Sequence, residues 1–160
     1  MPIISFATPK GGAGKTTSAI ILATTLAQGV SVEIIDADPA ARAVAWSKRG
    51  KMPENLRITK SAGERAIQDE IDTAARRAAF VVIDLEGAAT QLNAMVLAES
   101  DLVVIPTGDE QQDADAAVEA LAQIKMQARA LRREIPAAIL FARTKAAVKA
   151  RNEREINAAM

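Results

Sequence analysis

The chain has 160 residues, a formal net charge of zero, and neither cysteine nor histidine, which excludes disulfides, thiolate metal sites and histidine catalysis. Hydrophobic residues make up 49% of the sequence, so a folded domain with a core is expected rather than a disordered chain. No apolar run approaches the roughly 18 residues of a membrane span, and a cytoplasmic protein is therefore expected.

Apolar runs that resemble strands alternate with stretches of helical periodicity along the chain. In chain order we expect strand 2–8, helix 16–28, strand 31–36, helix 40–48, strand 56–59, helix 64–78, strand 80–84, helix 90–98, strand 102–106, helix 111–133, strand 137–142 and helix 146–159. The strand segments are continuous apolar runs, which are typical of parallel strands buried on both faces. The expected fold is a single α/β domain over residues 1–160, with three layers (α/β/α) and a mostly parallel sheet.

A glycine-rich segment, Lys10 to Thr17, lies between the first expected strand and the first expected helix. Its glycines allow backbone amides to approach a phosphate, and the helix N-terminus adds a positive dipole end. The residues predicted to bind a nucleotide are Gly11, Gly12, Ala13, Gly14, Lys15, Thr16 and Thr17. Lys15 is expected against the β- and γ-phosphates and Thr16 on Mg²⁺. A turn with two solvated lysines is the weaker alternative, because a strand and a helix flank the segment.

Carboxylates end two of the expected strands, at the sheet edge where parallel folds gather their functional residues. Asp84 ends the buried strand 80–84, which is the Walker B pattern of an aspartate that binds Mg²⁺ directly or through water. The alternative is a strand that simply ends at a solvated aspartate. Asp36 and Asp38 are two residues apart, so on an extended backbone their side chains share a face.

The glycine-rich segment departs from the usual phosphate-loop pattern. Pro9 stands where the first glycine would be, and Lys10 precedes the glycines. This K-G-G-x-G-K-[ST] arrangement, together with the sequence Asp36-Ala37-Asp38-Pro39, resembles the ParA/MinD family of deviant Walker A ATPases. Within that family the chain is most similar to small plasmid or chromosome partition proteins of the ParA type and to VirC1-like proteins. The resemblance implies a P-loop NTPase fold. Family members usually continue with further strands and a helix, so it also implies a C-terminally short form.

The resemblance further implies the roles of the site residues. ATP or ADP and Mg²⁺ would be the cofactors, with Thr16, Asp36 and Asp84 around the metal. Lys15 and Asp38 would be catalytic, Asp38 by orienting the attacking water.

The function implied by the same resemblance is partition of plasmid or chromosomal DNA, driven by weak ATP hydrolysis. Two ATP-bound subunits would form a sandwich homodimer in which Lys10 of each subunit is catalytic at the nucleotide of the other. The dimer would bind DNA non-specifically on the nucleoid, and a ParB-like centromere-binding protein would trigger hydrolysis.

The charge pattern and the polarity of the C-terminal segment bear on the possible partners and on the alternative functions. Charges between residues 125 and 154 are mostly basic, which suits either a helix dipole or a nucleic-acid surface. A MinD-like membrane switch would need an amphipathic C-terminal helix, and residues 151–157 are too polar for one, so no membrane partner is expected. A non-catalytic nucleotide-binding interaction protein is the remaining alternative.

Overall fold

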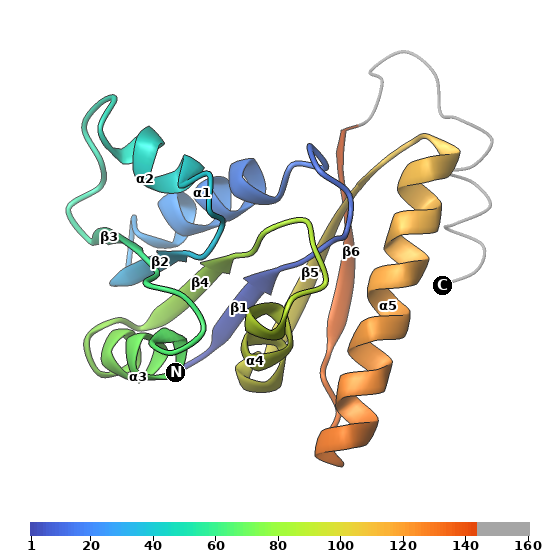
Figure 1. Ribbon diagram of the computed structural model, residues 1–160. Helices are drawn as coiled ribbons and strands as arrows, with labels where there is room; N and C mark the ends of the chain where they lie inside the picture. The colour runs from blue at the N-terminus through green and yellow to red at the C-terminus, as the bar shows by residue number, and fades with distance from the viewer. Residues whose placement is uncertain (144–160) are drawn as a thin grey trace.

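The structure, a computed structural model, describes residues 1–143. Its centre is a parallel sheet with helices on both faces (Figure 1). The strands of the described chain are β1 (Ile3–Phe6), β2 (Val32–Asp36), β3 (Leu56–Lys60), β4 (Phe80–Asp84), β5 (Leu102–Gly108) and β6 (Ala137–Arg143). Their spatial order is β3-β2-β4-β1-β5-β6, and every neighbouring pair is parallel. The expected three-layer fold is confirmed.

The helices form the two outer layers. On one face lie α1 (Lys15–Leu26) and α2 (Arg42–Ser47), and on the other lie α3 (Ile67–Arg77), α4 (Gln91–Glu99) and α5 (Gln111–Leu131). Side chains of one strand alternate between the two cores, so that Val81 and Ile83 pack toward α3 while Val82 packs toward α1. Because both faces are buried, the strands have continuous apolar sequences.

Two helices begin two or three residues later than the sequence pattern predicts. The helix expected from residue 64 begins at Ile67, because Gly63 has a positive φ of 101° and residues 64–66 form a turn. The helix expected from residue 40 begins at Arg42, after Ala41 with a φ of 49°. The helix expected over 146–159 lies outside the described residues.

The carboxyl ends of the strands converge on one edge of the sheet. The glycine-rich segment follows β1 at this edge, and Asp36 and Asp84 are the last residues of β2 and β4. Because the strands are parallel and α5 connects β5 to β6, α5 begins at this edge and runs back to the opposite one. Its basic end, near Arg129, therefore lies far from the glycine-rich segment (Figure 1).

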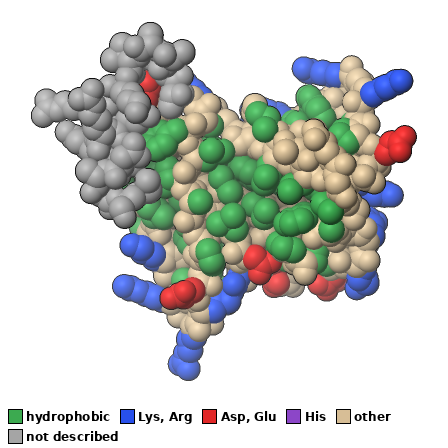
Figure 2. All heavy atoms as spheres, turned by 180° about the vertical axis from the view of Figure 1, so that it is seen from behind, with side chains coloured by type: hydrophobic (Ala, Val, Ile, Leu, Met, Phe, Trp, Pro, Cys, Tyr) green, Lys and Arg blue, Asp and Glu red, His purple; other side chains and the backbone are tan. Residues whose placement is uncertain are grey.

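The described helices leave part of the α1 face uncovered. Neither α1 nor α2 covers β6, where Leu140 is 40% exposed, and Ile21 of α1 is 61% exposed. Hydrophobic side chains gather across the middle of the face seen from behind (Figure 2). No helix within residues 1–143 is both long and apolar enough to span a bilayer.

Candidate nucleotide-binding site

The loop from β1 to α1 has the backbone shape that its glycines permit. Gly12 and Gly14 have φ values of 74° and 99°, in the left-handed region where a side chain is strained. Gly14 is also the N-cap of α1, so the helix begins at Lys15 and directs its free amides toward the loop. Ala13 is 2% exposed and anchors the loop in the protein. The loop can therefore surround an anion, as the sequence predicts.

Lys15 is the buried cation of this loop. Its side chain is 7% exposed, and its ammonium donates to the carbonyl oxygens of Thr8 at 3.2 Å and of Lys10 at 3.3 Å. Burial lowers the pKa of Lys15, while the nearby carboxylates of Asp84 and Asp38 oppose that change. No carboxylate of the described residues bonds directly to the amine, so an incoming phosphate would be a strong partner.

Gly87, just beyond β4, lies against this lysine. A Cβ at residue 87 would come within 3.3 Å of the Lys15 Nζ and of the Pro9 carbonyl oxygen, and within 3.4 Å of the Gly11 amide nitrogen. These contacts are tighter than ordinary van der Waals separation. The glycine therefore allows the segment after β4 to pack directly on the phosphate-binding loop.

Asp36 and Asp84 lie opposite each other on β2 and β4. Both are fully buried, and one oxygen of Asp36 and both oxygens of Asp84 have no hydrogen-bond partner among residues 1–143. The other Asp36 oxygen accepts from the Val44 amide at 2.9 Å. Burial raises the pKa of Asp84 from 3.8 to about 6, and the charges of Asp36 and Asp38 add to this. The Thr16 hydroxyl and the Lys15 charge act in the opposite direction and partly offset this raise in the pKa of Asp84.

These unpartnered oxygens fit a small divalent cation. Within residues 1–143, no group of three or more acidic side chains is close enough to hold a metal without further ligands. Mg²⁺ is commonly held by one or two carboxylates together with water and the phosphates of a nucleotide. Thr16, Asp36 and Asp84 therefore suit an ion that binds together with a nucleotide.

Asp38 lies in the loop after β2 and is held at the start of α2. Its carboxylate accepts from the Ala40 amide at 2.8 Å and from Arg42 Nη1 at 3.1 Å. The Lys60 amine donates to the Asp38 carbonyl oxygen. The side chain is mostly buried yet close enough to Lys15 and Asp84 to affect the pKa of each. The sequence-predicted residues Lys15, Thr16, Asp36, Asp38 and Asp84 therefore gather at one place.

Lys10 points away from that place. Its ammonium forms an ion pair with Asp113 of α5, with 2.6 Å between Nζ and Oδ1. The sequence predicts that Lys10 is functional but does not indicate this partner. Asp113 is one of several acidic residues in its segment, and the sequence does not indicate that it pairs with Lys10.

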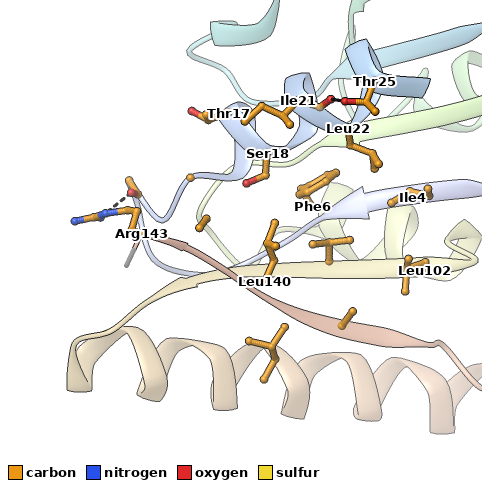
Figure 3. A pocket seen from close by; sticks show the side chains of 16 residues that line it. Ile4, Phe6, Thr17, Ser18, Ile21, Leu22, Thr25, Leu102, Leu140 and Arg143 are labelled. Carbon is orange, nitrogen blue, oxygen red and sulfur yellow. Dashed lines mark hydrogen bonds between the residues drawn. The ribbon is translucent and has the colours of Figure 1, made fainter. Parts of the chain in front are cut away.

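A groove of about 780 Å³ opens beside the loop, between α1 and strands β1, β5 and β6. Ile21 and Leu22 of α1 line one side, and Leu102 and Leu140 line the other (Figure 3). At the loop end, Arg143 Nη1 donates to the Gly12 carbonyl oxygen at 2.8 Å. Thr17 and Ser18 of α1 also line this end. The groove thus extends from the phosphate-binding loop over an apolar part of the sheet.

The sequence matches the family described as VirC1 protein over residues 1–159. The chain belongs to the VirC1 family. A protein named ParA from Rhizobium radiobacter is 33% identical over 161 residues, which cover all of this chain and 72% of that protein. The chain spans about half the length of three further curated relatives. The expected relationship to partition proteins of the ParA type is confirmed.

Solved structures agree with this assignment at the level of the fold. A plasmid partition protein from Borrelia burgdorferi has a TM-score of 0.81 and 24% identity, over 99% of this chain and 87% of that one. A putative plasmid partition protein from Borrelia burgdorferi bound to AMPPNP has a TM-score of 0.75 and 23% identity, over 99% and 80% of the two chains. This VirC1-family chain therefore has the fold of P-loop partition proteins.

Proposed function

We propose that this VirC1-family chain binds ATP and Mg²⁺ at the loop between β1 and α1 and hydrolyses ATP weakly, as a partition switch. The observation that carries the proposal is the pairing of a buried lysine with unsatisfied carboxylates. In the described part of the chain, Lys15 has only two carbonyl acceptors, and Asp84 beside it has two oxygens without partners. A nucleotide with a divalent cation would supply the missing partner to each. A structurally similar partition protein is bound to AMPPNP, which supports the same ligand class here.

The phosphates would be bound by the backbone amides of the loop and by the Lys15 amine. The residues proposed for this contact are Gly11, Gly12, Ala13, Gly14, Lys15, Thr16 and Thr17. Bound Mg²⁺, next to Thr16, Asp36 and Asp84, would neutralise phosphate charge. The nucleoside would occupy the loop end of the groove, near Thr17 and Arg143.

Asp38 is the proposed positioning group for the attacking water. Phosphoryl transfer needs alignment and charge neutralisation more than a strong base, so a carboxylate is sufficient in a chain without histidine. Its present hydrogen bonds to Ala40 and Arg42 keep it at the edge of the site. Closure on ATP would reorient it toward the phosphates.

The active state is proposed to be a homodimer in which Lys10 of each subunit contacts the nucleotide of the other. The cargo would be plasmid or chromosomal DNA, bound non-specifically on the nucleoid, with a ParB-like protein as the activator. Lys125, Arg129 and Arg132 are exposed at the basic end of α5 and are candidates for phosphate contacts. Their distance from the loop would leave both surfaces accessible at once.

The test is ATP turnover with Mg²⁺ and DNA, measured against protein concentration for the wild type and Lys10→Ala. The proposal expects turnover that rises more than linearly in the wild type and is lost in the variant. AMPPNP binding by calorimetry is measured on both proteins. Binding without turnover would favour a non-catalytic interaction protein, and absence of binding would reject the nucleotide site itself. Vesicle flotation with anionic lipid separates the MinD-like alternative.

A further inference from the structure

Lys10 and Asp113 join two segments that are 103 residues apart in sequence. The Lys10 ammonium is the partly exposed member, with 26% of its side chain accessible, whereas the Asp113 side chain is 3% exposed. A carboxylate this deeply buried is stable as an anion only while a cation or several donors contact it. Lys10 is the cation that contacts Asp113 in this structure.

Asp113 is also held in place by its surroundings. Its second carboxylate oxygen accepts from the Glu110 amide at 3.4 Å, and its carbonyl oxygen accepts from the Thr107 hydroxyl at 3.0 Å. A Cβ added to Gly108 would lie 3.0 Å from the carboxyl carbon of Asp113 and still closer to one of its oxygens. The carboxylate therefore cannot follow Lys10 if the lysine moves away.

The backbone of Lys10 has a separate role from its side chain. The Lys10 carbonyl oxygen accepts from the Lys15 amine at 3.3 Å and so belongs to the phosphate-binding loop. The side chain can leave Asp113 by rotation of its own bonds while the loop keeps its shape. A Lys10 side chain that contacts the nucleotide of a second subunit, as proposed above, would take up a different rotamer from the one that binds Asp113.

We infer that Asp113 is an intramolecular latch on Lys10, and that it sets the protein concentration at which the ATP-bound dimer forms. The inference rests on the proposed function, because it takes the dimer and the role of Lys10 in it from there. When Lys10 turns toward the partner subunit, the Asp113 carboxylate is left buried without its cation. That cost opposes dimerisation and keeps the chain monomeric until ATP and a partner subunit compensate for it.

The test compares dimerisation of the wild type, Asp113→Asn and a matched control, Asp115→Asn. Asp115 lies two residues further along α5, is exposed, and pairs with Gln111 at 3.0 Å. Analytical ultracentrifugation is done with Mg²⁺ and AMPPNP over a range of protein concentrations. The latch predicts that Asp113→Asn dimerises at about a tenfold lower concentration than the wild type, a typical size for a coupling between sites. Asp115→Asn is expected to match the wild type.

A second substitution disturbs the ion pair between Lys10 and Asp113 without changing either residue. Gly108→Ala places a methyl group against the Asp113 carboxylate and displaces it without removing its charge. Like Asp113→Asn, this variant is expected to dimerise at a lower protein concentration than the wild type. Melting curves identify a variant that has failed to fold.

A direct readout of the latch needs no dimer. The rate of Lys10 acetylation by acetic anhydride is followed by mass spectrometry on the nucleotide-free monomer, with exposed Lys48 as the internal reference. Asp113→Asn is expected to raise the Lys10 rate several-fold relative to Lys48. Unchanged labelling together with an unchanged or higher dimerisation concentration would overturn the latch. If AMPPNP still binds when the latch is overturned, the proposed nucleotide-binding function is retained. If AMPPNP does not bind, both the latch and the proposed function are rejected.

Discussion

Asp36 and Asp84 are register partners at the carboxyl ends of two hydrogen-bonded parallel strands. Both are fully buried, and three of their four carboxylate oxygens have no hydrogen-bond partner in the part of the chain that the structure describes. Two neighbouring buried carboxylates disfavour each other's charge when no cation is bound. The free protein therefore carries an electrostatic cost at this edge of the sheet, and binding of a divalent cation would relieve it.

Asp84→Asn is expected to have opposite effects on stability and on activity. The amide cannot be charged, so the nucleotide-free variant is expected to unfold at a higher temperature than the wild type. Because burial raises the pKa of Asp84 to about 6, the free energy of unfolding is expected to be roughly 1–3 kcal/mol higher in the variant than in the wild type. Because Asp84 is a proposed ligand of Mg²⁺, the variant is also expected to lose the proposed Mg²⁺-dependent ATP turnover. Scanning calorimetry in EDTA and a phosphate-release assay measure the two effects, with exposed Asp72→Asn as the control.

The pH dependence of stability follows from the same carboxyl group. Its pKa is raised in the folded state, from 3.8 to about 6, so the folded protein binds the proton more tightly than the unfolded chain does. This contribution favours folding below pH 3.8 and is lost as the pH rises through about 6. In EDTA, the stability advantage of Asp84→Asn over the wild type is expected to grow across that interval and then to stay constant. Urea unfolding at a series of pH values measures it, and a difference independent of pH would contradict the assignment.

Gly87→Ala is expected to weaken nucleotide binding with little effect on the fold. The new methyl group would press on the Lys15 amine and on the Pro9 carbonyl, both at 3.3 Å, and shift the lysine from its position. A tenfold loss of AMPPNP affinity, about 1.4 kcal/mol, is the expected scale. Gly29→Ala is the matched control, since no atom lies within 4 Å of a Cβ built there. Equal affinities for the two variants, measured by calorimetry, would argue against close contact between residue 87 and the loop.

Arg143→Ala is expected to loosen the phosphate-binding loop. The variant loses the hydrogen bond from Arg143 Nη1 to the Gly12 carbonyl oxygen, which ties the end of β6 to the loop. A hydrogen bond of this kind contributes about 1 kcal/mol, so a roughly fivefold lower affinity for a fluorescent ATP analogue is expected. Arg129→Ala removes an exposed arginine far from the loop and is expected to bind as the wild type does. Identical affinities in both variants would exclude a role for Arg143.

Much of the fold could be predicted because its signals are local. The apolar run of β4 ends at Asp84, and the glycine-rich segment directly follows the run of β1. Such signals need only a few neighbouring residues, and parallel pairing then brings the strand ends to the same edge. Helix boundaries were less predictable, because Ala41 adopts a positive φ that its sequence context does not indicate.

The contacts that the sequence did not reveal join distant segments. Lys10 meets Asp113 across 103 residues, and Arg143 meets Gly12 across 131 residues. Both contacts depend on the position of β5 and β6 in the sheet, where they lie on the opposite side of β1 from β4. That position is set by the strand order and not by the local sequence pattern. The uncovered groove was also unpredictable, because the apolar run of β6 has the same appearance as that of a buried strand.

Gly87 and Gly108 share a property with consequences for how this sequence can evolve. Neither has a positive φ, so neither is a glycine because of its backbone conformation. Gly87 leaves room for the Lys15 amine, and Gly108 leaves room for the carboxylate that holds Lys10. Alanine, the smallest mutational step from glycine, would already disturb one of the two lysines at each position. Selection on the two lysines would therefore appear in descendants of this sequence as two glycines that are distant from the phosphate-binding segment in sequence, one just beyond β4 and one at the end of β5.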